Sequence, residues 1–160
     1  RGKKFTDKEI IDAGLAKKAE RGLIDKFRNC IVFPISDSAG RIVGFSGRSF
    51  GENASPDAPK YLNSPETPLF RKSRILYGFD KAKQAMRKNR CAILVEGQMD
   101  LLASHKAGWA NTVAVSGTAF TPEHAGLIMR MMDNLVIALD PDEAGFKAAA
   151  RAARAAPSAR

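Results

Sequence analysis

Residues 91–100 read CAILVEGQMD, five apolar residues followed at once by a glutamate, a glycine and a polar segment. Five consecutive apolar residues have the length of a strand that is buried on both faces, as parallel strands are. The polar segment leads into residues 99–107, which have a helical pattern and end before Gly108. The stretch therefore predicts a buried strand that is followed directly by a helix.

The same rhythm returns twice further along the chain. Residues 112–115 and 135–139 are short apolar runs of strand length. The first is followed by a helix start at residues 121–123, where a capping threonine, a first-turn proline and a glutamate stand in favoured places. The second is followed by a helical pattern over residues 143–156. Three strand–helix units in a row predict an α/β fold in which helices flank a parallel sheet, and we assign this domain to residues 91–160.

The first 90 residues predict a different set of elements, typical of an α+β subdomain. A capped helix comes first, then a β-hairpin, a proline-rich loop and a basic helix at the boundary between the two halves. These elements are expected at residues 6–20 for the first helix, 30–35 and 41–48 for the hairpin strands, 51–70 for the loop and 81–90 for the basic helix.

Positive charge is concentrated in the first half of the chain. The 160 residues include 26 Lys and Arg against 17 Asp and Glu, a net charge of +9. Residues 1–90 hold 20 of these cations and 10 of these acids, a net charge of +10, whereas residues 91–160 have a net charge of −1. Such an excess attracts polyanions, with nucleic acid first and anionic membranes second, although a solvated surface that only raises solubility has the same composition.

Composition excludes several classes of protein. No apolar run approaches the roughly 20 residues that a membrane helix needs, and no signal-peptide pattern opens the chain. Cys30 and Cys91 are the two cysteines, and there are only two histidines. A disulfide scaffold or a zinc site within this chain is therefore not expected. We expect a cytoplasmic protein with no membrane partner.

Acidic residues follow the first and third predicted strands. Glu96 comes directly after the first strand, and Asp140 and Asp142 come directly after the third. Because ligands bind beyond the carboxyl ends of parallel strands, we expect these carboxylates to gather at one edge of the sheet. Their repulsion requires a cation, and oxygen ligands suit Mg²⁺ or Mn²⁺. Two other interpretations stay open, because such acids can also cap turns and helices or form a phosphoacceptor site of the response-regulator type.

These motifs resemble those of a known enzyme family. Residues 96–100 are similar to the motif E-G-Y-M-D, residues 116–119 to L-G-T-A, and residues 140–145 to D-G-D-x-A-G, a set that marks the TOPRIM domain of bacterial primases. Residues 60–70, KYLNSPETPLF, are nearly the primase signature K-Y-L-N-S-P-E-T-x-x-F, and residues 76–78 follow in the family's order. Over essentially its whole length, the chain resembles the RNA polymerase core of the DnaG-type primases, with a TOPRIM domain of Rossmann-like architecture.

The resemblance implies an enzyme that makes short RNA primers on single-stranded DNA during replication. It would use metal-dependent nucleotidyl transfer with ribonucleoside triphosphates. Glu96, Asp140 and Asp142 would be the catalytic and metal-binding carboxylates. Glu96 could instead act as a general base, and Asp100 would be an outer ligand. The family correspondence assigns template or nucleotide contacts to Arg48, Lys60, Asn63, Lys72, Lys26 and Arg28.

The resemblance also implies partners and segments that this sequence does not include. A replicative helicase would bind through a C-terminal region, and zinc is expected only in an N-terminal domain. We therefore expect residues 1–90 to be a partial subdomain and residues 91–160 to be a TOPRIM domain without its C-terminal end. The isolated fragment is expected to be an incomplete catalyst.

Three residues depart from the family's pattern. Gln98 replaces the usual aromatic residue of E-G-Y-M-D, Pro141 replaces the glycine of D-G-D, and Cys30 stands where an arginine is common. None of these changes removes a carboxylate, so the predicted metal site survives all three.

Two alternative functions stay open at this point. One is another TOPRIM enzyme, a topoisomerase or an OLD-type nuclease, and the other is a non-catalytic nucleic-acid-binding fragment. A topoisomerase needs a nucleophilic tyrosine downstream of the TOPRIM segment, whereas Tyr61 and Tyr77 both lie upstream of it.

Overall fold

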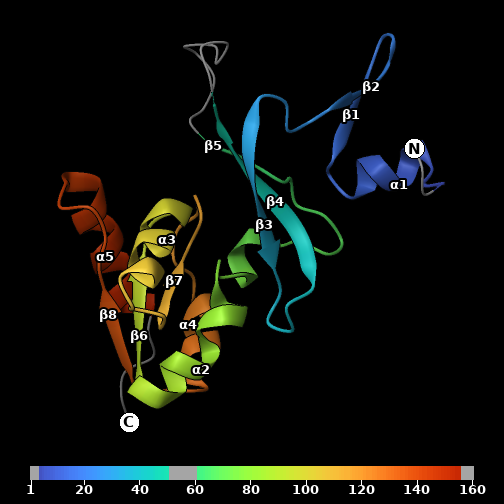
Figure 1. The fold of residues 1–160 in the computed structure, drawn as a ribbon. Coiled ribbons are helices and arrows are strands. Elements are labelled where there is room, and N and C mark those ends of the chain that lie inside the picture. The colour runs from blue at the N-terminus through green and yellow to red at the C-terminus, as the bar shows by residue number, and fades with distance from the viewer. Residues whose placement is uncertain (1–3, 51–60, 156–160) are drawn as a thin grey trace. The chain divides into compact units, whose positions relative to one another are not determined.

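The structure of the chain is a computed structural model, which describes residues 4–50 and 61–155 (Figure 1). By their contacts the residues form two units, one of residues 1–35 and 42–71, the other of residues 36–41 and 72–160. Each unit has its own sheet structure and is described by itself. The division of the sequence at residue 90 into two domains stays a prediction.

The first unit begins with helix α1 (Asp7–Asp12), which has the predicted capping box. The Thr6 hydroxyl accepts a hydrogen bond from the Glu9 amide at 3.2 Å, and the Glu9 carboxylate accepts one from the Thr6 amide at 2.7 Å. Each side chain thus satisfies a backbone donor that the first helical turn leaves unpaired.

The helix predicted over residues 6–20 is wrong beyond Asp12. Gly14 has a φ of +70°, a left-handed conformation that ends helices, and a Cβ at this position would lie 2.7 Å from the Pro65 ring. The following residues form strand β1 (Ala16–Ala19), which pairs antiparallel with β2 (Gly22–Asp25). Alanine and lysine favour helices, but pairing with β2 overrides that preference here.

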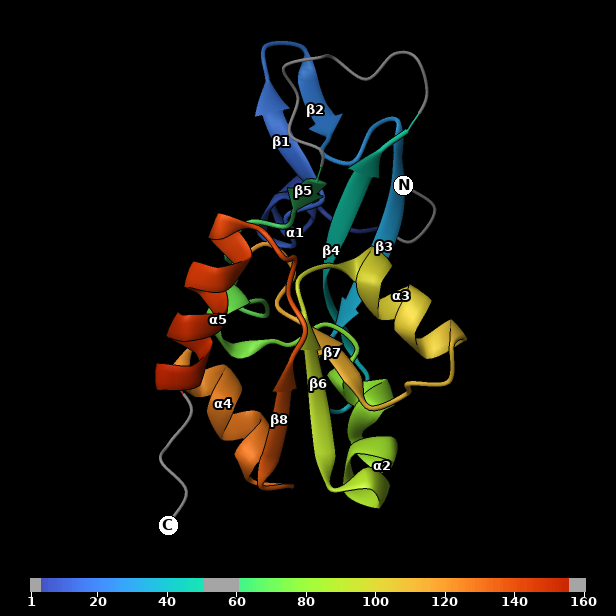
Figure 2. The same ribbon diagram turned by 90° about the vertical axis from the view of Figure 1, so that its left-hand side faces the viewer.

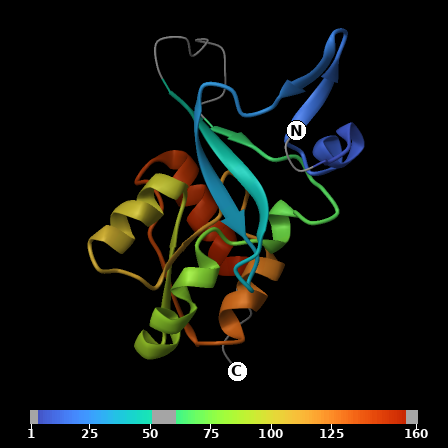
Figure 3. The same ribbon diagram turned by 45° about the vertical axis from the view of Figure 1, so that its right-hand side comes forward.

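The predicted β-hairpin is confirmed, since β3 (Cys30–Ser36) and β4 (Ile42–Ser49) are neighbours in one sheet (blue to cyan in Figure 3). A third strand, β5 (Tyr61–Asn63), pairs antiparallel with β4, with Asn63 opposite Ser46. The prediction of a loop throughout residues 51–70 is therefore wrong at residues 61–63. Three residues are too few to show strand periodicity, and their pairing with β4 depends on residues distant in the sequence.

The second unit contains the predicted parallel sheet. Its central strand β6 (Cys91–Val95) lies between β7 (Thr112–Ala114) and β8 (Asn134–Ile137), and both pairings are parallel. Helix α3 lies on one side of this sheet, with α4 and α5 on the other (Figure 2). The helices are the short 3₁₀ helix η1 (Lys72–Arg74), α2 (Phe79–Asn89), α3 (Gln98–Lys106), α4 (Pro122–Met129) and α5 (Glu143–Ala155).

Alternate residues of β6 have different surroundings. Ala92 and Leu94 are fully buried and belong to a core cluster with Met86 of α2 and Ile128 of α4. On the other face of the sheet, the side chain of Val136 on β8 is 50% exposed and lines an apolar cavity of about 630 Å³ with Ile93 and Trp109, among other residues. Among the described residues, no helix is both long and apolar enough to cross a membrane.

Candidate active site

The four predicted carboxylates lie in, or one helical turn beyond, the loops at the carboxyl ends of β6 and β8, with Asp100 in the first turn of α3. Because β6, β7 and β8 run in the same direction, these loops share one edge of the sheet. Two backbone hydrogen bonds hold the outer strand ends to the central one. The Ser116 amide donates to the Glu96 carbonyl at 3.1 Å, and the Ala138 amide donates to the Leu94 carbonyl at 2.8 Å.

Glu96 lies in the electric field of three aspartates at this edge. Partial burial raises the pKa of its carboxyl group, and the negative charges of Asp140, Asp142 and Asp100 raise that pKa further. Repulsion of this kind requires proximity, so the structure brings the four predicted carboxylates to the same edge.

Two of these carboxylates also hold the backbone at the starts of helices. One oxygen of Asp100 accepts a hydrogen bond from the Gly97 amide at 3.0 Å, at the start of α3. One oxygen of Asp142 accepts a hydrogen bond from the Gly145 amide at 2.7 Å, at the start of α5. Capping, the alternative role for such acids, is therefore realised for both residues.

The carboxylates are near one another without forming a ready-made cage. Within residues 4–50 and 61–155, no three His, Cys, Asp or Glu side chains converge into a group that could hold a metal ion. All four acids at the sheet edge are exposed, so their side chains can reorient. The donor set fits a hard divalent cation, because the cation's charge would relieve the repulsion that raises the pKa of Glu96. Their role as ligands stays a prediction.

Gln98 connects two of the three loops. Its side chain is only 3% exposed, and its amide nitrogen donates a hydrogen bond to the Ser116 hydroxyl. Ser116 has a φ of +60°, an unfavourable conformation for a residue with a side chain. Gln98 therefore keeps the loop after β7 close to the loop that carries Glu96. The usual aromatic residue of the family has no side-chain amide to make this hydrogen bond.

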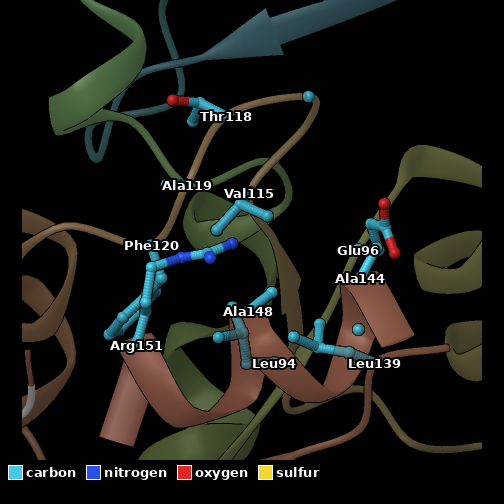
Figure 4. Close-up of a pocket in the computed structure, with 12 residues that line it drawn as sticks. Leu94, Glu96, Val115, Thr118, Ala119, Phe120, Leu139, Ala144, Ala148 and Arg151 are labelled. Atoms are coloured by element: carbon cyan, nitrogen blue, oxygen red, sulfur yellow. The ribbon is translucent and has the colours of Figure 1, made fainter. Parts of the chain in front are cut away.

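A pocket of about 340 Å³ opens beside Glu96 (Figure 4). Its walls come from β6, from the loop after β7 and from α5, and they are mostly apolar, with Leu94, Val115 and Phe120 among them. The guanidinium group of Arg151, on α5, points into the pocket at the end opposite Glu96 (Figure 4).

Two sequence families match the chain one after the other. The family described as "DNA primase catalytic core, N-terminal domain" matches residues 1–83, just over half of the chain. The chain belongs to the DnaG-type primase family. The family described as "Toprim domain" matches residues 90–159. A primase core domain followed by a Toprim domain is the order that the motifs of this DnaG-type chain predict.

Curated relatives of this DnaG-type chain are longer than it is. It is 48% identical to the DNA primase of Listeria monocytogenes over 141 residues, and this match covers 88% of this chain and 22% of the relative. It is 43% identical to the DNA primase of Streptomyces coelicolor over 157 residues, and this match covers 95% of this chain and 24% of the relative. The chain thus spans about a quarter of the length of these DNA primases.

Solved structures of DnaG proteins have the same fold. The RNA polymerase domain of Mycobacterium tuberculosis primase DnaG matches with a TM-score of 0.86 at 40% identity, over 94% of this chain and 51% of that one. A DnaG primase catalytic domain bound to ssDNA matches with a TM-score of 0.80 at 41% identity, over 91% of this chain and 44% of that one. The predicted α/β fold with a TOPRIM sheet is confirmed.

The predicted nucleic-acid-binding residues of this DnaG-type chain are divided between the two units. In the first unit, Arg48 and Asn63 lie on the paired strands β4 and β5, and the register Ser46–Asn63 and Arg48–Tyr61 puts both on one face. Lys26 and Arg28 lie between β2 and β3. Lys72 begins η1 in the second unit, where its carbonyl accepts a hydrogen bond from the His124 ring. Lys60 lies outside the described residues.

Sequence reasoning missed Arg151. The Ala- and Arg-rich end of the chain predicts a helix that covers the sheet, and α5 is that helix. Arg151 is seven residues from Ala144 and three from Ala148, which line the same pocket. This spacing puts all three on one helix face. Lys147 and Arg154 are also four and three residues from Arg151, so spacing alone did not distinguish Arg151 from them.

Proposed function

We propose that this chain forms part of a primase active centre, which synthesises RNA primers on single-stranded DNA by nucleotidyl transfer. The observation that supports this most strongly is the group of four carboxylates at the carboxyl edge of the Toprim sheet, where Asp140, Asp142 and Asp100 raise the pKa of Glu96. The names of the relatives support the reaction type, since they are DNA primases.

In the proposed reaction, the 3′-hydroxyl oxygen of the growing primer attacks the α-phosphorus of an incoming ribonucleoside triphosphate. A new P–O bond forms, the bond between the α- and β-phosphates breaks, and pyrophosphate leaves with the bonding electrons. The hydroxyl proton passes to a base. As the alternative to its role as a metal ligand, Glu96 would be this base, since its raised pKa makes it a better proton acceptor than an ordinary carboxylate.

We propose that Mg²⁺ or Mn²⁺ binds at the same edge. Glu96, Asp140 and Asp142 would hold the ion, with Asp100 as an outer ligand. When bound, the ion would screen the negative charge that develops on the phosphates. The protein's own part is to present the carboxylates on fixed loop ends and to hold those loops through Gln98 and the two aspartate caps.

Contacts with template and nucleotide are proposed for the basic residues. Arg48 and Asn63 are the strongest pair, because their strands place them as diagonal neighbours on one face of the sheet in the first unit. Lys60, Lys72, Lys26 and Arg28 complete the set. The solved DnaG catalytic domain that is described as bound to ssDNA supports single-stranded DNA as a partner.

The test is primer synthesis by the full-length protein that contains this chain, with Glu96→Gln and Asp140→Asn as variants. Each variant removes a charge without changing size, and we expect each to lower the rate by about 100-fold or more. Glu143→Gln is the matched control, because Glu143 is exposed and pairs with Lys147 on the same helix. Full activity of Glu96→Gln would contradict the proposed site. Strand cleavage without primer synthesis would favour a topoisomerase or nuclease instead.

A further inference from the structure

The pocket beside Glu96 lies between two neighbouring strands, β6 and β8, whose following helices lie on opposite sides of the sheet. β6 is followed by α3 on one side of the sheet, whereas its neighbour β8 is followed by α5 on the other side (Figure 2). In α/β folds, ligands bind in the crevice at such a switch point. The pocket is lined by Glu96 after β6, by Leu139 after β8 and by α5, so it occupies this crevice.

The two ends of the pocket differ in charge. Glu96, with its three neighbouring aspartates, is at one end, and the guanidinium of Arg151 is at the other (Figure 4). Among the described residues that line the pocket, Arg151 is the one cation.

Arg151 also differs from the other cations of its helix. Lys147 is paired with Glu143, and the Arg154 side chain donates to the Ala150 carbonyl at 3.2 Å. By contrast, no Asp or Glu among the described residues lies within 4.0 Å of the Arg151 guanidinium. Within the part of the chain that the structure describes, its charge therefore faces the pocket without a carboxylate partner.

These two ends fit a polyphosphate chain that has the proposed divalent cation at its acidic end and Arg151 at the other. A guanidinium group presents parallel N–H donors that match two oxygens of one phosphate. A volume of about 340 Å³ is at the lower end of the range for small-molecule sites, which suits a polyphosphate better than a complete nucleotide.

We propose that Arg151 binds the terminal phosphate of the polyphosphate chain that occupies this pocket. This inference rests on the proposed nucleotidyl transfer. Before transfer the bound polyphosphate is the triphosphate of the incoming nucleotide, and after transfer it is pyrophosphate. Arg151 then increases the affinity for the substrate and delays the release of the product.

The test uses the full-length protein with Arg151→Leu, Arg151→Lys and the control Arg154→Leu. Arg154 is on the same helix but does not line the pocket. The measurements are the KM for nucleoside triphosphate, the inhibition constant of inorganic pyrophosphate, and the binding of magnesium pyrophosphate by calorimetry. Loss of a charged hydrogen bond costs about 1.5–3 kcal/mol, so Arg151→Leu is expected to raise both constants at least about tenfold. Arg151→Lys should restore part of the loss, and Arg154→Leu should change neither constant more than about twofold.

The outcomes separate this inference from the proposed function. If primers are made and Arg151→Leu leaves both constants unchanged, the inference is overturned while the function stands. A raised KM with unchanged pyrophosphate inhibition supports binding of the substrate triphosphate and rejects binding of the product. If the wild-type protein makes no primers, calorimetry still decides, because loss of pyrophosphate binding in Arg151→Leu supports the pocket and equal binding rejects it.

Discussion

Gly145 fixes the geometry of the acidic loop more than any other single residue there. Its amide is bound to the Asp142 carboxylate at 2.7 Å, and a Cβ at this position would lie 1.9 Å from the carbonyl oxygen of Asp140. Only a residue without a side chain allows the start of α5 to approach the backbone of Asp140 this closely. The spacing of the two aspartates therefore depends on a glycine that carries no charge itself.

We expect Gly145→Ala to destabilise the chain by about 1–3 kcal/mol, the usual cost of forcing an extra carbon into a packed site. The clash is with backbone atoms, so relief requires α5 or the acidic loop to move. The measurement is the free energy of unfolding, together with the half-saturating Mg²⁺ concentration for primer synthesis, which should rise.

Gly126→Ala is the matched control for this substitution. Gly126 lies inside helix α4, and a Cβ there would meet no atom within 4 Å. Alanine is favoured over glycine in a helix by about 0.5–1 kcal/mol, so this variant should be as stable as the wild type or more so. Equal stability of both variants would show that the contact at Gly145 does not constrain the loop.

At the scale of elements, the strands and the helices α2 to α5 of the second unit were predictable because each has a local signal, whereas the short helix η1 was not predicted. Continuous apolar runs predicted β6, β7 and β8, and the Thr121 cap predicted the start of α4. β1, β2 and β5 were missed because they exist through pairing with other strands. The grouping of the acids followed from strand direction alone, whereas the Gln98–Ser116 bond and the position of Arg151 depend on side-chain packing that no spacing rule shows.

The start of α4 contains a buried histidine that is held in its neutral form. His124 has no exposed surface, its Nδ1 accepts from the Thr121 amide at 3.3 Å, and its Nε2 lies 2.9 Å from the Lys72 carbonyl. Burial lowers the pKa of the imidazole from its ordinary value of 6.5. Protonation of Nδ1 would also place its N–H group next to the Thr121 amide N–H, so that two donors would face each other with no acceptor.

This arrangement predicts a loss of stability in mild acid. Below pH 6.5 the unfolded chain takes up a proton at His124 before the folded chain does, so the free energy of unfolding should fall as the pH drops from 7.5 to 5.5. His124→Gln keeps a capping side chain without a titrating group, so its unfolding free energy should depend less steeply on pH in this window. Identical slopes for the two proteins would rule out His124 as the source.

For the whole molecule, the distribution of charge separates binding from chemistry. Residues 1–90 have a net charge of +10, and residues 91–160, which include the four carboxylates, have a net charge of −1. In the proposed primase, the first part attracts the phosphate backbone while the acids of the second attract cations.

We expect the affinity of the chain for single-stranded DNA to fall steeply as salt concentration rises. Each phosphate contact contributes about 0.7 to the slope of log K against log salt concentration, so Arg48→Gln should reduce the slope by about that amount. Lys8→Gln is the control, because Lys8 is already paired with Asp12 at 2.8 Å. Fluorescence anisotropy over a salt series measures both slopes, and affinity that ignores salt would contradict phosphate contacts.

The half-exposed Val136 on β8 has a practical consequence for work with this chain. β8 is an outer strand of its sheet, and one of its faces joins an apolar cavity. An outer strand offers unpaired backbone groups to any other chain, and an apolar side chain beside them favours self-association. We therefore expect preparations of the isolated chain to aggregate more readily as protein concentration rises, and a charged residue in place of Val136 to reduce this self-association.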